Sequence, residues 1–376
     1  MKVRDFHLLE ALMRDFTEKR DIPGVDLTVA VGYDIVYRFQ TGYADRANRK
    51  PITDNTQYFL YSASKPITCA AVLRLVERGD IDLAAPLSDY LPEFANLTVD
   101  NGTDAPHPAN NPLTVRDLFC MTNGYSYEYS AKIAAMQGGN CATLPTVLQL
   151  AKLPLRFEPH TAYAYGLGHD ILAALAERVT GKKYRDYLAE VVFEPLGMTR
   201  THMHPNAFDR ENLAQLYRMT DGVTHEEKTV NTFIFGDEYD SGGAGIISCP
   251  EDYIKFAMTM TGRGLSKNGY RLLLPETVEL MRKPHLNQAE FAAFNSFGCN
   301  LPGYSYGLGV RTHIDPSRSG RLSPVGEFGW DGAAGAFTSF DPENSITIYY
   351  AQHVIGTPHA VNHKDILNTV YRALGV

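Results

Sequence analysis

Apolar residues recur at helical spacing through the first twenty positions, with charged residues between them. This pattern predicts an amphipathic helix over 1–20 that packs against the rest of the protein. Its apolar positions are Phe6, Leu8, Leu9, Leu12, Met13 and Phe16. The segment lacks the uninterrupted apolar core of a signal peptide and the length of a membrane span.

Alternating patterns at both ends of the chain predict strands. Residues 26–32 and 35–42 form a predicted hairpin around Tyr33-Asp34. Further strands are expected near 307–314, 335–340 and 345–353, before a closing helix over 359–374. The middle of the chain is mostly helical in pattern. We therefore expect an α/β (α+β) fold, with an antiparallel sheet flanked by helices and an inserted helical region.

The length suits one catalytic unit over 1–376. Within it we expect an α/β subdomain from 1–80 and 240–376, and a mostly helical subdomain from 81–239. The stretches 101–112, 125–140 and 284–302 are irregular and long enough to be substrate-binding loops.

Composition indicates a cytoplasmic enzyme. The net charge of −8, without basic clusters, gives no reason to expect nucleic acid or an anionic membrane as a partner. Five scattered cysteines, without a Cys-x-x-Cys pair, are expected to be buried free thiols. The oligomeric state is left open.

Ser62-Ala63-Ser64-Lys65 is the principal candidate for chemistry. Pro66 and a buried helix over 67–79 follow it, so Ser62 is expected at the N-cap or in the first turn. A serine and a lysine three residues apart there lie on one helix face, about 5–6 Å apart at Cβ. The amine can then take the proton of the hydroxyl, and the free N–H of Ser62 can face an oxyanion. If the motif is only structural, Ser62 is a cap and Lys65 a solvated first-turn residue.

Two other kinds of site have weaker support. Gly303-Tyr304-Ser305-Tyr306-Gly307 spells an α/β-hydrolase nucleophile elbow, but a strand-like run follows it where an elbow needs a helix. His359 and His363 have helical ligand spacing without the glutamate of a zinc protease. No Gly-rich phosphate loop is present. We expect no metal and no cofactor.

The Ser-x-x-Lys context resembles the serine β-lactamase and penicillin-binding-protein superfamily, and within it the β-lactamase-like (class C-related, family VIII) carboxylesterases. Similar stretches follow in the expected order. They are 79–83, 86–92, 113–118 with 122–124, 157–159, 193–198 and 241–248. The resemblance implies the β-lactamase/DD-peptidase-like fold, with the catalytic cleft between sheet and helical region.

The resemblance also implies the remaining site residues. A catalytic tyrosine maps to Tyr165, with Tyr163 as the competing choice. The Lys-Thr-Gly or Trp-Gly-Gly element maps to Trp330-Asp331-Gly332-Ala333, and the N–H of Ala333 becomes the second oxyanion donor beside that of Ser62. Gly332 would let this strand approach the substrate carbonyl. Asp331 departs from the esterase pattern and is expected to be a solvated strand residue, with orientation of a cationic or hydroxylated substrate as the alternative.

Two departures bear on the substrate. Leu167 stands where lactamases and peptidases carry an asparagine, and Trp330 stands where they carry a lysine. Both changes remove polar recognition of a β-lactam or peptide, so a small-molecule ester with a short to medium acyl chain is the expected substrate. The expected function is a serine carboxylesterase acting through an acyl-enzyme on Ser62, with possible acyl transfer to alcohols. A D-aminoacyl amidase, D-peptidase or weak β-lactamase is the alternative, and a non-catalytic acylated sensor is the least favoured.

Overall fold

A computed structural model describes residues 5–103, 105–228, 231–296 and 301–376. Within them, an eight-stranded antiparallel sheet has the order β10-β11-β12-β13-β14-β1-β2-β3. Its strands are β1 (Gly24–Val31), β2 (Asp34–Asp45), β3 (Lys50–Pro51), β10 (Tyr304–Tyr306), β11 (Arg311–His313), β12 (Phe328–Gly329), β13 (Phe337–Asp341) and β14 (Ile346–Ala351). Strand β1 pairs with β14, with Leu27 opposite Tyr350, so both ends of the chain build one sheet.

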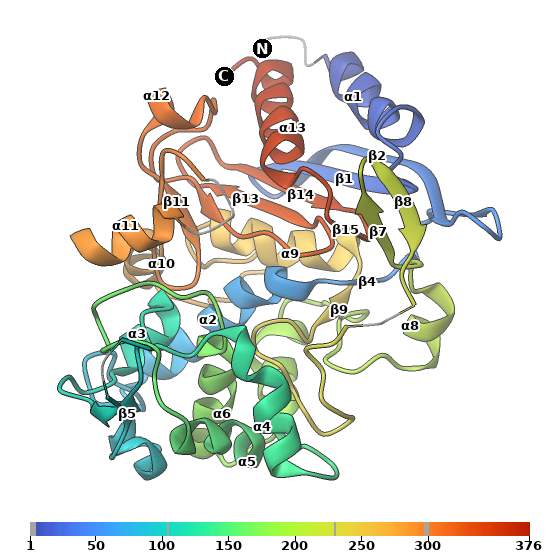
Figure 1. The fold of residues 1–376 in the computed structure, drawn as a ribbon. Helices are drawn as coiled ribbons and strands as arrows, with labels where there is room; N and C mark the ends of the chain where they lie inside the picture. The colour runs from blue at the N-terminus through green and yellow to red at the C-terminus, as the bar shows by residue number, and fades with distance from the viewer. Residues whose placement is uncertain (1–4, 104, 229–230, 297–300) are drawn as a thin grey trace.

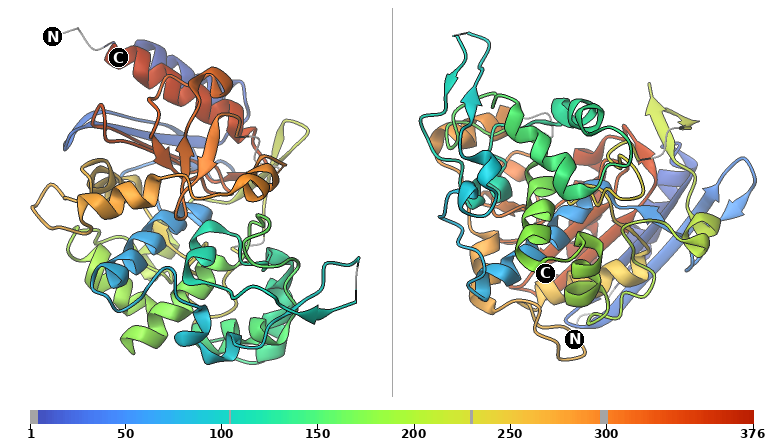
Figure 2. Two further views of the ribbon diagram at one scale, coloured as in Figure 1. Left: turned by 90° about the vertical axis from the view of Figure 1, so that its left-hand side faces the viewer. Right: turned by 90° about the horizontal axis from the view of Figure 1, so that it is seen from below.

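Two helices from opposite ends of the chain cover one face of this sheet. Helix α1 (His7–Glu18) and helix α13 (His359–Leu374) lie side by side there (Figures 1 and 2). Leu9, Met13 and Phe16 of α1 are buried against alternate residues of β1, as the amphipathic pattern requires. Helix α9 (Pro250–Thr261) packs on the other face, where Tyr253 stacks on Tyr349 with 4.4 Å between ring centroids.

The remaining helices lie mainly beyond α9, in the lower part of Figure 1. They are α2 (Lys65–Glu77), α3 (Val115–Cys120), α4 (Ser130–Gln137), α5 (Thr143–Val147), α6 (Gly168–Thr180), α7 (Tyr184–Leu188) and α8 (Ala207–Asn212), with α10 (Pro275–Arg282), α11 (Gln288–Ser296) and α12 (Pro316–Ser319) nearer the sheet edge. Helix α2 is buried from Lys65 to Leu73 because its apolar residues occupy every face. It therefore sits inside the molecule rather than on a surface.

Shorter strands form further small sheets. These are β4 (Tyr58–Phe59) with β9 (Ile247–Ser248), β5 (Thr98–Val99) with β6 (His107–Pro108), and β8 (Val223–Glu226) with β7 (Tyr217–Thr220) and β15 (Val354–Ile355). Strand β7 pairs in parallel with β15, which lies near the C-terminus. The 81–239 segment thus contributes strands as well as helices, and one of its strands, β7, is hydrogen-bonded to β15.

The α/β fold, the antiparallel hairpin and the closing helix are confirmed, but the hairpin turn is Gly32-Tyr33 rather than Tyr33-Asp34. Two expected irregular stretches instead contain helices: α4 forms within 125–140, and α11 within 284–302. Ser305 lies in the middle of β10 and is buried, and β11 follows it, so the geometry of a nucleophile elbow is absent there. None of the helices in the described ranges combines the length and the apolar character that crossing a bilayer requires.

Candidate active site

A tight turn places Ser62 in front of helix α2. After β4 the chain forms a 3₁₀ turn, Tyr61–Ser64, and α2 begins only at Lys65. Tyr61 adopts a φ of 48°, a left-handed conformation that is strained for a bulky residue. Ser62 therefore lies in a separate turn before the helix, rather than at its N-cap or in its first turn as the sequence predicted.

The amine of Lys65 links three groups. Its Nζ atom lies 3.0 Å from Ser62 Oγ, 2.9 Å from the hydroxyl of Tyr127 and 2.8 Å from the carbonyl oxygen of Gly243. The side chain of Lys65 is fully buried, so it is not a solvated first-turn residue. These three oxygen atoms hold the amine against the serine hydroxyl.

Glycines make room for this arrangement. A Cβ on Gly243 would lie 2.9 Å from Asp170 Oδ2 and 3.1 Å from the Tyr127 hydroxyl. A Cβ on Gly242 would lie 2.1 Å from the carbonyl oxygen of His169. The Ser-Gly-Gly stretch at 241–243 therefore has a physical reason: only glycine lets this backbone reach the lysine between α6 and the tyrosine.

Tyr127 was not assigned from the sequence. It lies in a 3₁₀ turn between α3 and α4, within one of the stretches expected to be a substrate-binding loop. Desolvation raises the pKa of its hydroxyl well above the usual value, with nearby Tyr165 and Asp170 as smaller causes. The phenol therefore keeps its proton at neutral pH. The one sequence signal for Tyr127 was its position after the Thr122-Asn123-Gly124 motif. That motif does not indicate which of the nearby tyrosines points towards Lys65.

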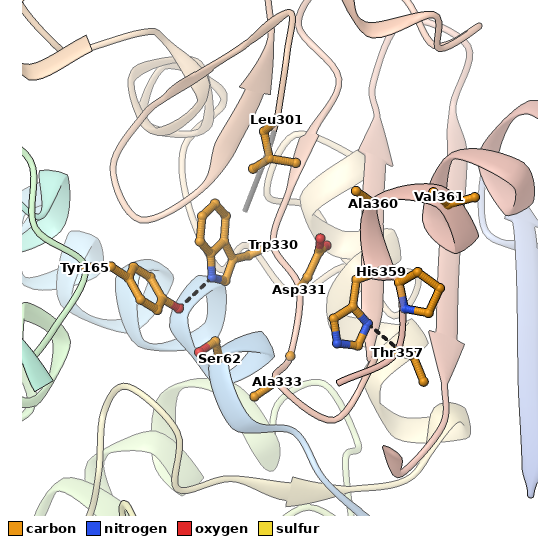
Figure 3. Close-up of a pocket in the computed structure, with 12 residues that line it drawn as sticks. Ser62, Tyr165, Leu301, Trp330, Asp331, Ala333, Thr357, His359, Ala360 and Val361 are labelled. Carbon is orange, nitrogen blue, oxygen red and sulfur yellow. Dashed lines mark hydrogen bonds between the residues drawn. The ribbon is translucent and has the colours of Figure 1, made fainter. Parts of the chain in front are cut away.

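Tyr165 reaches the same site from the loop before α6. Lys65 Nζ lies 4.6 Å from the centroid of its ring. Its hydroxyl accepts a hydrogen bond from Trp330 Nε1 at 2.9 Å, as Figure 3 shows. Tyr163, the competing choice, packs instead among aromatic rings, 5.2 Å from Phe294 and 5.4 Å from Tyr306 between centroids.

The segment after β12 forms the opposite wall. The backbone of Trp330 is fixed by Thr338, whose hydroxyl accepts from the Trp330 N–H at 3.0 Å. A Cβ on Gly332 would lie 2.4 Å from the carbonyl oxygen of Leu60, two residues before the serine. Gly332 thus allows close approach to the backbone that carries Ser62, whereas the sequence suggested approach to the substrate. Its N–H donates a hydrogen bond to the carbonyl oxygen of Ala336 at 2.8 Å. The next residue, Ala333, lines the cavity together with Ser62.

Asp331 is not a solvated strand residue. Its carboxylate lies 2.6 Å from Nη1 of the fully buried Arg311 and 3.2 Å from Nδ1 of His363. Although burial opposes ionisation, the positive charge of Arg311 holds the pKa of Asp331 well below its usual value. The sequence could not show this because Arg311 lies on another strand.

A largely apolar cavity of about 440 Å³ connects these groups. It is lined by Ser62, Tyr165, Leu301, Trp330, Asp331, Gly332, Ala333, Thr357, Pro358, His359, Ala360 and Val361 (Figure 3). Of the predicted residues, Leu167 lies elsewhere, in the main hydrophobic core. Within the described residues, no group of three or more His, Cys, Asp or Glu side chains is placed to hold a metal ion.

Comparisons with known proteins identify the family. Protein Rv1367c of Mycobacterium tuberculosis is 28% identical over 90% of this chain and 91% of its own, and Esterase EstB of Burkholderia gladioli is 28% identical over 87% and 85%. The solved structure of EstCE1, described as a hydrolase with promiscuous acyltransferase activity, superimposes with a TM-score of 0.82 at 24% identity, covering 96% of this chain and 97% of that one. The family model described as Beta-lactamase matches residues 9–368. The chain therefore belongs to the beta-lactamase family.

Proposed function

We propose that this protein is a serine carboxylester hydrolase that forms an acyl-enzyme on Ser62. The observation that carries the proposal is the 3.0 Å contact between Ser62 Oγ and the buried amine of Lys65 at the wall of an apolar cavity. A hydroxyl beside a desolvated amine is an activated nucleophile, and the cavity provides room for an acyl chain.

The acylation step follows from the contacts. Lys65 in its neutral form takes the proton of Ser62 as the oxygen attacks the ester carbonyl. The N–H groups of Ser62 and Ala333 then stabilise the oxyanion, each contributing typically about 10²–10³ in rate. Tyr165 faces the cavity and protonates the leaving alcohol. Tyr127 keeps Lys65 positioned and supplies a second hydroxyl for proton return.

Deacylation uses the same groups in reverse. A water molecule takes the place of the alcohol and gives its proton to the Tyr165 phenolate, while the Lys65 ammonium returns its proton to Ser62 Oγ as the acid is released. If an alcohol enters instead, the acyl group is transferred to it. The names of two similar proteins support both outcomes: EstB is called an esterase, and EstCE1 a hydrolase with promiscuous acyltransferase activity.

The cavity favours esters over amides and β-lactams. Trp330 presents an indole where a lysine would attract a substrate carboxylate, and its Nε1 donor is already bonded to Tyr165. Leu167 is buried, and its side chain has no amide with which to bind a peptide-like substrate. Amidase or weak β-lactamase activity is the second candidate. Turnover of an amide and of a β-lactam, measured beside that of an ester, tests it.

Substitution of Ser62 tests the proposal. Ser62→Ala should abolish hydrolysis of p-nitrophenyl butyrate and prevent a butyryl adduct in the intact mass. Ser305→Ala is the matched control, because Ser305 lies in the rival motif but on a buried strand. Full activity of Ser62→Ala, or loss only in Ser305→Ala, would show a different nucleophile. An adduct that never clears from the wild type would indicate a sensor rather than an enzyme.

A further inference from the structure

A second cavity of about 310 Å³ adjoins the active-site cavity. The two have the lining residues Leu301, Ala360 and Val361 in common, so they adjoin at the start of α13, and we refer to the pair as the groove. In Figure 3, Ala360 and Val361 lie on the opposite side of the active-site cavity from Tyr165. The second cavity therefore lies on the side of the active-site cavity away from Tyr165.

The lining of this second cavity is positively charged. It includes Arg318, Arg321 and Lys364, with Asp365 as its one acidic residue. Asp365 is already paired with Arg20, at 3.2 Å. No ion pair involving Arg318, Arg321 or Lys364 is found within the described part of the chain. Three cations therefore gather around a concave surface of a protein whose net charge is −8.

Arg321 gives the strongest indication of a ligand. Its side chain is only 6% exposed, and its Nη1 atom has no hydrogen-bond partner among the described residues. The guanidinium lies over the ring of Tyr304, 5.3 Å from the centroid, which holds it in place. A buried guanidinium with an unpartnered donor is costly, and an anion in the cavity that Arg321 lines would offset its positive charge.

The other two cations are held near Arg321 by the fold. Asn368 of α13 accepts from the Leu322 N–H at 2.9 Å and donates to the Gly320 carbonyl at 2.9 Å, tying this loop to the helix. A Cβ on Gly320 would lie 2.9 Å from Lys364 Nζ, so the ammonium lies against the same loop. The cavity is built from two connected elements rather than from one flexible arm.

We propose that this second cavity binds the anionic end, a carboxylate or a phosphate, of an ester whose carbonyl lies at Ser62. The inference rests on the proposed function, because it assigns the far end of the same substrate. Trp330 has no charge with which to bind an anionic substrate group. The proposed subsite binds such a group farther from the reacting carbonyl. Arginine and lysine suit both anions, the first through paired N–H groups and the second as a point charge.

Arg321 has a structural role as well, because its charge helps to keep Asp331 ionised. The exposed Arg318 and Lys364 make no such contact, so they are the better positions for a test. The double variant Arg318→Gln/Lys364→Gln removes two charges at the groove. The double variant Lys19→Gln/Lys267→Gln removes two charges from exposed positions that line neither cavity and serves as the matched control.

The test uses two series of esters that differ in charge at constant size. For the acyl side, p-nitrophenyl hemiadipate is compared with p-nitrophenyl hexanoate. For the alcohol side, the butyrates of 4-hydroxybenzoate and of 4-hydroxyphenyl phosphate are compared with that of methyl 4-hydroxybenzoate. We expect the Arg318/Lys364 variant to lower kcat/KM about tenfold for the anionic member of at least one series, with the neutral members unchanged. Raising the salt concentration should weaken the wild-type preference.

The two alcohol-side anions separate carboxylate from phosphate recognition. Equal effects of the Arg318/Lys364 and Lys19/Lys267 variants, or equal effects on charged and neutral esters, would overturn the proposed subsite. The proposed function would still be supported in that case if the wild type hydrolyses the neutral esters and Ser62→Ala does not. Hydrolysis that persists in Ser62→Ala would remove the function itself, so the two failures are distinguishable.

Discussion

The amine of Lys65 lies 2.9 Å from the hydroxyl of Tyr127, although 62 positions separate the two residues in the chain. Tyr165 approaches the same amine through the face of its ring instead. The candidate site therefore contains two tyrosines in different relations to one lysine. The Tyr127 hydroxyl is hydrogen-bonded to the amine, whereas Tyr165 lines the cavity.

Removing either hydroxyl should separate these roles. Tyr165→Phe and Tyr127→Phe should each lower kcat for p-nitrophenyl butyrate by about 10²–10⁴, because each loses a proton-handling group. Tyr163→Phe is the control and should change kcat little, because Tyr163 packs among aromatic rings. Burst kinetics supply the second measurement. A burst that is lost in only one variant would assign acylation to that tyrosine, and unchanged kcat in both would contradict the proposed chemistry.

Gly332→Ala should damage activity through the backbone. The new Cβ would lie 2.4 Å from the Leu60 carbonyl, so the turn that carries Ala333 must move away from Ser62. Because the oxyanion donors must stay in position, we expect kcat to fall at least about 100-fold. In contrast, Gly79→Ala has open space around its Cβ and a φ of 78°, so it should cost about 1 kcal/mol of stability with kcat unchanged. Comparable kcat in both variants would argue against this role for Gly332.

Asp331→Asn should destabilise the fold by about 3–5 kcal/mol at pH 7, because it leaves the buried Arg311 without its closest anionic partner. The folded-state pKa of Asp331 is depressed, so its contribution is present above the unfolded value of 3.8 and is lost as pH falls below it. The difference in unfolding free energy between wild type and variant should therefore shrink below about pH 4.

Urea unfolding at a series of pH values measures this difference. Glu10→Gln is the control, because its pair with Arg14 is exposed and should be worth under about 1 kcal/mol. A constant difference between wild type and Asp331→Asn from pH 7 to pH 3 would mean that the ion pair is not its source.

Trp330→Phe should retain the shape of the cavity wall but lose the hydrogen bond to Tyr165. Because that bond fixes the orientation of the Tyr165 hydroxyl, we expect kcat to fall about tenfold while KM for p-nitrophenyl butyrate changes little. Acyl chains from acetate to octanoate, tested in parallel, show whether the ring also limits chain length. A change in KM alone would assign Trp330 to binding rather than to positioning.

The sequence alone determined the elements whose signals are local. The β1–β2 hairpin, the amphipathic helices α1 and α13 and the buried helix after Ser62 follow from spacing and turn residues that are adjacent in the chain. The Ser62–Lys65 contact belongs to the same class, because three residues around one turn bring the two side chains together.

Tertiary structure decided the groups that come from distant segments. Tyr127 faces Lys65 and Arg311 neutralises Asp331 because loops and strands remote in sequence converge there, and no local pattern specifies which residue of an irregular stretch points inward. The contact of Gly332 with Leu60 could not be predicted for the same reason, since the atom its missing Cβ makes room for belongs to the chain before Ser62. Local periodicity fixes helices and strands, whereas long-range packing fixes which side chains meet.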